Sequence, residues 1–144
     1  MNKKVRAIFS LEIRRSRRDN RERLIIQVSK EVQIIALLTG GAFDLACEVL
    51  GVDSMMHHEY SEVFTVTRQD IDEYVAKYGV PPGGYNSTGS ICEGINYYYD
   101  GECWHLIEME RYIHFYDRTF TNEAEAQKEL VNLLLQRTGN GMKW

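Results

Sequence analysis

Apolar and polar residues alternate most regularly between Ile95 and Thr121, in the stretch INYYYDGECWHLIEMERYIHFYDRTFT. Alternation with period 2 in runs rich in aromatic and β-branched residues is typical of strands with one buried face. Asp100-Gly101 is a strong hairpin signal, because both central residues of a two-residue turn need φ > 0. A second reversal is expected at Glu110-Arg111. The pattern predicts a three-stranded antiparallel sheet over about 95–121.

These two turns imply a register. Tyr97 would pair with Trp104, and Glu108 would pair with Ile113. The expected core face carries Ile95, Tyr97, Tyr99, Trp104, Leu106, Ile113 and Phe115. The opposite face, which suits a covering helix or a partner protein, carries Asn96, Tyr98, Cys103, His105, Ile107, Met109, Tyr112, His114 and Tyr116. A one-residue slip at the second turn would exchange the faces of the third strand.

Upstream of the sheet, apolar residues recur at helical spacing. One helix is expected from an N-cap at Asn20 to the stop at Gly40-Gly41, with Ile25, Val28, Val32, Ile35 and Leu38 on one stripe. A short helix follows, in which Phe43, Ala46, Cys47 and Leu50 share a face and Gly51 ends the last turn. The segment Phe9 to Glu22 is compatible with either a strand or a helix.

Further along, the pattern predicts a short strand at Val63 to Val66, and then a helix over Arg68–Tyr78. Thr67 and Asp70 have the spacing of a capping box for this helix. Residues 81–94 form a glycine-rich loop, and Asn122 begins the last helix. We therefore expect one α+β domain over 1–144, with the sheet packed against several helices.

Charge is distributed unevenly along the chain. Residues 1–24 hold nine Lys and Arg against three acidic residues, which is a net charge of +6, and the remaining 120 residues hold eight against 18, a net of −10. The cluster of Arg14, Arg15, Arg17, Arg18, Arg21 and Arg23 could contact phosphates, but the acidic remainder opposes nucleic-acid binding. Such a body attracts basic partners.

Candidate catalytic chemistry is sparse. Cys103, His105 and His114 share a predicted sheet face and could hold zinc, but no carboxylate is expected beside them. A Cys-His nucleophile also lacks an orienting group and an oxyanion donor. Glu108 and Glu110 are the only same-face acidic pair near aromatics. We expect no catalytic site, no cofactor and no metal.

Acidic and aromatic side chains around the sheet instead indicate a docking surface for a protein. Its candidate residues are Asp70, Asp72, Glu73, Tyr98, Glu102, His105, Glu108, Glu110, His114 and Tyr116. The N-terminal apolar run is too short for a signal peptide, because Arg6, Glu12 and Arg14 interrupt it, so a cytoplasmic protein without a membrane span is expected.

The sequence DGECWHLIEMERY, followed by a strand, the helix entry TFTNE and an apolar helix, resembles the C-terminal half of small bacterial immunity proteins of polymorphic-toxin and contact-dependent growth inhibition systems. The similarity covers Gly94 to about Arg137. It implies a non-catalytic cytoplasmic inhibitor that binds a cognate toxin, such as a basic nuclease. Two alternatives remain: a nucleic-acid-associated regulator that uses the arginine cluster, and a small metal-dependent enzyme.

Overall fold

The computed structural model describes residues 28–138, Met142 and Trp144. Within them, a three-stranded antiparallel sheet is combined with four α-helices, the last of which follows the sheet. The predicted α+β class is therefore confirmed. In chain order the elements are α2 (Lys30–Leu38), α3 (Ala42–Leu50), the 3₁₀ turn η1 (Tyr60–Glu62), α4 (Arg68–Tyr78), β1 (Gly94–Tyr99), β2 (Trp104–Glu110), β3 (Ile113–Phe120) and α5 (Glu123–Thr138). The basic segment 1–24 lies outside the described residues.

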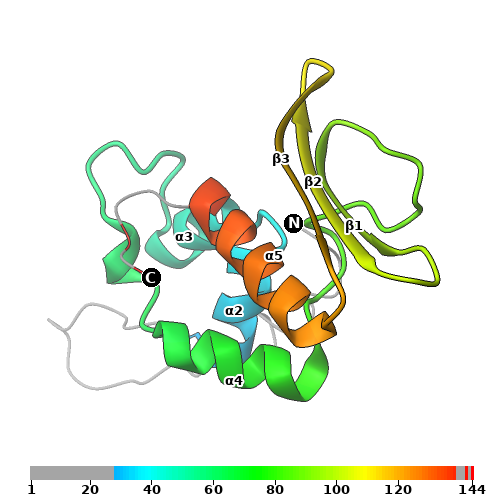
Figure 1. The fold of residues 1–144 in the computed structure, drawn as a ribbon. Helices are drawn as coiled ribbons and strands as arrows, with labels where there is room; N and C mark the ends of the chain where they lie inside the picture. Colours follow the sequence, from blue (N-terminus) through cyan, green and yellow to red (C-terminus); the bar gives the residue numbers. More distant parts are fainter. Residues whose placement is uncertain (1–27, 139–141, 143) are drawn as a thin grey trace, which may run out of the picture.

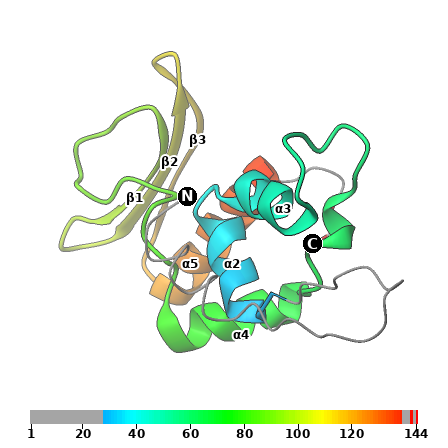
Figure 2. The same ribbon diagram turned by 180° about the vertical axis from the view of Figure 1, so that it is seen from behind.

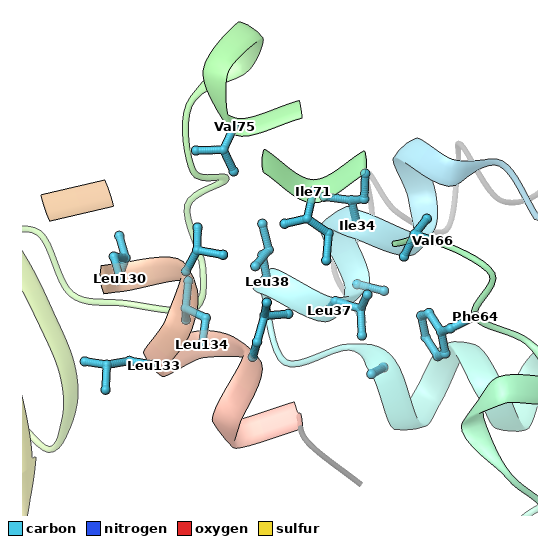
Figure 3. Close-up of a cluster of buried hydrophobic side chains, with 14 of the residues drawn as sticks. Ile34, Leu37, Leu38, Phe64, Val66, Ile71, Val75, Leu130, Leu133 and Leu134 are labelled. Atoms are coloured by element: carbon cyan, nitrogen blue, oxygen red, sulfur yellow. The ribbon is translucent and has the colours of Figure 1, made fainter. Parts of the chain in front are cut away.

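Helix α5 occupies the centre of the fold. It lies between the sheet and the other helices, and contacts β2 and β3 on one side and α2 on the other (Figures 1 and 2). Helix α2 also packs against α3 and α4. Figure 3 shows the apolar side chains that meet between these helices, including Leu37 and Leu38 of α2, Ile71 of α4, and Leu130 and Leu134 of α5. The sheet thus has one face on α5 and one face turned away from the helices.

The first described helix begins later than expected. Ser29 is extended, at φ −61° and ψ 151°, and its hydroxyl accepts a hydrogen bond from the Val32 N–H, so Ser29 is the N-cap of α2. A continuous helix from Asn20 to Leu38 is therefore wrong, while Asn20 itself lies outside the described residues.

Local capping signals predicted two other helices correctly. Helix α4 spans Arg68–Tyr78, as expected, and Thr67 and Asp70 form both halves of the capping box. The Asn122 carboxamide accepts hydrogen bonds from the N–H groups of Ala124 and Glu125 at the start of α5. Helix α3 ends at Gly51 as predicted, but its apolar face is rotated, because Leu45 is buried and Phe43 is exposed.

The strand expected at Val63 to Val66 is absent. These residues follow η1 as irregular chain, although Val63, Phe64 and Val66 are buried in the core. Buried Gln33 explains this conformation, because its side-chain oxygen accepts the N–H groups of Thr65 and Val66. The segment therefore bonds to a side chain of α2 and needs no neighbouring strand.

The first hairpin has a longer loop than predicted. Tyr99 pairs with Trp104 and Tyr97 pairs with Leu106, so residues 100–103 form a four-residue connection, and the expected pairing of Tyr97 with Trp104 is wrong. The shift is two residues, and side chains keep their faces because strand residues alternate with period 2. Ile95, Tyr97 and Leu106 are accordingly buried, while Trp104 is half-buried and Tyr99 remains largely exposed.

The second hairpin departs from the expectation in a way that changes faces. Its two-residue turn is Arg111-Tyr112, one residue later than predicted, and Phe115 is an extra residue in a β-bulge. Glu108 consequently pairs with Tyr116 rather than with Ile113. Tyr116 therefore lies on the α5 side and packs against the core, whereas Ile113 and Phe115, expected in the core, are exposed.

The glycine-rich loop covers part of the outer sheet face, where a helix or a partner was expected. Asn86 bonds alongside β1, through its N–H to the Ile95 carbonyl and its carbonyl to the Tyr97 N–H. The loop runs beside β1 (Figure 1), and Asn96 of β1 is fully buried, with side-chain hydrogen bonds to Asn86 and Cys92 of the loop. Ile107 and Met109 on the same face are also buried. Within the described residues, no helix is long and apolar enough to cross a membrane.

Candidate functional site

The loop between β1 and β2 is built by Asp100. One carboxylate oxygen, Oδ1, accepts the N–H groups of Glu102 at 2.8 Å and Cys103 at 2.9 Å. The Asp100 N–H donates to the Cys103 carbonyl, and Gly101 supplies the φ of +101° that the reversal requires. These bonds hold the pKa of Asp100 well below its usual range, with the backbone N–H of Cys103 the largest cause and the His105 side chain the next. Asp100 is therefore a carboxylate at neutral pH.

Three side chains of different chemistry meet at this loop. The Nε2 atom of His105 lies 2.6 Å from Oδ2 of Asp100 and 3.6 Å from Sγ of Cys103, and the sulfur lies 3.8 Å from the same oxygen. The His105 ring stacks on Tyr98, with centroids 4.8 Å apart and planes inclined by 9°. The expectation that no carboxylate lies beside Cys103 and His105 is thus wrong.

This arrangement does not form a nucleophile relay. A catalytic base contacts the nucleophile through one ring nitrogen and its orienting acid through the other. Here Nε2 of His105 makes both contacts, so the two ring nitrogens are not divided between the thiol and the carboxylate. Burial, followed by the negative charge of Asp100, raises the pKa of the Cys103 thiol, which opposes formation of a thiolate.

His114 is remote from this loop, so the candidate grouping of Cys103, His105 and His114 around one ion does not form. His105 pairs with Thr119 across the sheet, whereas His114 pairs with Met109, four residues or about 13 Å further along β2. His114 instead bonds through Nδ1 to Asp117, at 3.0 Å. The shift in register accounts for the separation.

A second feature occupies the opposite end of the sheet. Tyr112, Ile113 and Phe115 are 90%, 60% and 65% exposed, and we call these three residues the hairpin patch. Acidic side chains lie beside them: Glu110 ends β2, and the Glu93 carboxylate accepts the Arg111 N–H at 3.0 Å. The patch combines an apolar centre with a charged surround, which is the composition of a protein-binding surface.

The three α4 carboxylates predicted to face a partner protein each bond to a side chain of α2 or of α4 itself. Asp70 bonds to Lys30 at 2.8 Å as well as capping α4, and the Lys30 ammonium, followed by the Thr67 N–H, lowers its pKa to about 2. Asp72 bonds to Arg68, and Glu73 accepts from Gln69.

The predicted docking residues of the sheet are spread over both faces. Tyr98 and His105 are in contact, and exposed Glu102 lies in the adjacent loop. Glu108 holds Arg137 of α5 at 2.9 Å, and Tyr116 lies on the same helix-facing side, where burial is the main cause of its raised pKa. Glu110 and His114 are exposed near the hairpin patch.

Two functional candidates were missed from the sequence. The pattern places Asp100 in the turn and among the acidic residues around the sheet, and does not group it with Cys103 and His105, although the spacing D-x-x-C-x-H contains the three ligand types that meet in the structure. Ile113 and Phe115 were assigned to the core because the alternation extends through them. A turn without glycine was the available signal that this alternation would fail.

Comparison of the chain with protein-family models, with curated proteins and with solved structures finds no match.

Proposed function

We propose that the chain is a non-catalytic inhibitor that binds and neutralises a basic toxin domain in the cytoplasm, as the immunity proteins it resembles do. The observation that carries the proposal is the hairpin patch. Three large apolar side chains are presented to solvent in a sheet whose neighbouring apolar residues are buried. In protein interfaces a few large side chains, often aromatic, carry much of the binding energy once a partner covers them.

Charge favours a basic partner over an acidic one. Glu93 and Glu110 lie next to the patch, and residues 25–144 carry a net charge of −10. Such a field accelerates encounter with a positively charged domain and opposes contact with nucleic acid. Glu110 is the best charge probe, because it is exposed at the end of β2, whereas Glu108 is tied to Arg137 and its reversal would also disturb α5.

The direct test uses the toxic domain encoded by the adjacent gene. Binding of that domain is measured by calorimetry with the wild-type chain, with Tyr112→Ala and with Phe115→Ala. Each substitution should weaken binding by about 30-fold or more, which corresponds to roughly 2 kcal/mol for an interface hot spot. Phe43→Ala removes another exposed aromatic side chain, from α3, and serves as the matched control.

Two further measurements complete this test. Glu110→Lys should slow association most strongly at low ionic strength, because surface charges act mainly on the encounter rate. The wild-type chain should abolish toxicity of the domain in cells, and the two patch variants should do so less effectively. Equal affinity of all variants would move the interface elsewhere. A neighbourhood without a toxin gene, together with no protein partner in the native host, would remove the proposal.

A further inference from the structure

The Asp100–Cys103–His105 cluster has the dimensions of a metal site. In tetrahedral zinc coordination, bond lengths near 2.3 Å to sulfur and 2.0–2.2 Å to nitrogen and oxygen place neighbouring ligand atoms roughly 3.5 Å apart. The three ligand atoms here are separated by 2.6, 3.6 and 3.8 Å. Only the separation between Nε2 and Oδ2 must widen, by about 0.8 Å, when an ion replaces the proton that the two atoms share.

The cluster is also organised before any ion binds. Oδ1 of Asp100 is used by the two backbone N–H groups of the loop, which leaves Oδ2 directed at His105. Tyr98 fixes the plane of the His105 ring by stacking on it. Hydrogen bonds and packing that orient ligand side chains in this way commonly raise metal affinity by 10–100-fold.

We propose that Asp100, Cys103 and His105 bind one Zn²⁺ ion, with the fourth position open to water. The sulfur and imidazole ligands favour zinc over Mg²⁺ and Ca²⁺, which prefer sets made only of oxygen atoms. The ion links the two ends of the connecting loop, at Asp100 and Cys103, to His105 of β2. It therefore fastens the β1–β2 loop, at the end of the sheet opposite the hairpin patch, and is independent of the proposed inhibitor function.

The site is tested on the full chain after removal of metal with a chelator. Zn²⁺ is titrated by calorimetry, and Co²⁺ is added separately because a cobalt–thiolate bond gives a charge-transfer absorption band. We expect one ion per chain, a cobalt–thiolate band and a rise in the thermal midpoint with Zn²⁺. Mg²⁺ at the same concentration should produce none of these changes.

Four single variants test two of the three ligands and supply two controls. Cys103→Ser and Asp100→Asn should each weaken Zn²⁺ binding by at least about tenfold, and Cys103→Ser should abolish the cobalt–thiolate band. Asp100→Asn is chosen because its amide oxygen can still accept the two loop N–H groups, so the hairpin is retained. Cys92→Ser removes an exposed thiol and His114→Gln removes the imidazole paired with Asp117, and neither should change binding.

The proposal is overturned if Zn²⁺ does not bind, if Cys103→Ser binds as tightly as the wild type, or if Cys92→Ser loses the ion equally. Circular dichroism of each variant establishes that the chain is folded. A folded Asp100→Asn variant with unchanged affinity would likewise remove Asp100 from the site and overturn it.

Discussion

Substitution of Asn96 by alanine should detach the glycine-rich loop from the sheet. Asn96 is fully buried on β1, and its side-chain oxygen accepts from Asn86 at 2.9 Å and from the Cys92 N–H at 3.0 Å. Its amide nitrogen donates to the carbonyls of Cys92 at 2.7 Å and Gly94 at 3.3 Å. One side chain thus satisfies three backbone groups of a loop that has no regular structure of its own.

The magnitude follows from these contacts. A hydrogen bond contributes about 1 kcal/mol net, so the three shorter bonds contribute roughly 3 kcal/mol, to which the longer bond to Gly94 adds little. Rehydration of the loop groups, once the loop opens, limits the loss to about that value. In a domain of this length we expect the thermal midpoint to fall by roughly 10 °C. Amide exchange at Cys92 should accelerate more than exchange in α5, because the loop opens before the core.

Asn96→Asp separates hydrogen bonding from side-chain size. The aspartate keeps both acceptor contacts but places an oxygen against the carbonyls of Cys92 and Gly94, so it should destabilise the chain as much as alanine does. Asn132→Ala on α5 is the control, since the structure records no hydrogen bond of that side chain among its described residues. Asn96 does not hold the loop if both Asn96 variants have free energies of unfolding within about 1 kcal/mol of the wild type and unchanged amide exchange rates in the loop.

Three further predictions concern single positions. Gly84→Ala should lower the free energy of unfolding by about 1–3 kcal/mol, because an added Cβ would overlap the Leu38 carbonyl oxygen; an unchanged thermal midpoint would contradict this. The Asp70 pKa of about 2 lies below the value in the unfolded chain, so the ion pair with Lys30 stabilises the fold above about pH 4. This stabilisation is lost as the pH falls toward 2. The stability of Asp70→Asn, measured by acid unfolding, should not show this loss between about pH 4 and 2. Tyr112→Gly should raise stability by about 1 kcal/mol, by removing a left-handed side chain, and yet weaken binding of the toxin domain; a loss of stability in denaturant titration would refute it.

The parts of the fold that the sequence predicted well depend on neighbouring residues. The N-terminus of α4 is set by Thr67 and Asp70, three positions apart, and the start of α5 by Asn122. Such signals need no knowledge of the rest of the chain. The prediction of a strand at Val63 to Val66 is wrong because the backbone of this segment hydrogen-bonds to the side chain of Gln33 instead of to another strand. Gln33 lies about 30 residues earlier in the chain.

Only two of the three residues of the candidate metal site could be grouped from the sequence. Cys103 and His105 share a face under either register, because a shift of two residues preserves the alternation. Asp100 joins them only when the connection lengthens to four residues and its carboxylate caps the loop. The dipeptide Asp-Gly is compatible with two structures: a two-residue hairpin turn, and a longer loop in which the Asp side chain accepts backbone N–H groups. The sequence alone therefore does not distinguish the two loop lengths.

At the second hairpin, the same residues that defeated the prediction are those proposed to bind a partner. Arg111 and Tyr112 adopt φ of 51° and 66°, a conformation that costs non-glycine residues roughly 1–2 kcal/mol each, and the bulge at Phe115 follows immediately. Asparagine and glycine would form this turn with less strain. The turn lowers the stability of the fold in two ways: its backbone is strained, and it exposes three apolar side chains to water. Departures from local preference concentrate where function requires them, and this coincidence makes the hairpin patch, more than the acidic helix α4, the surface at which binding should first be tested.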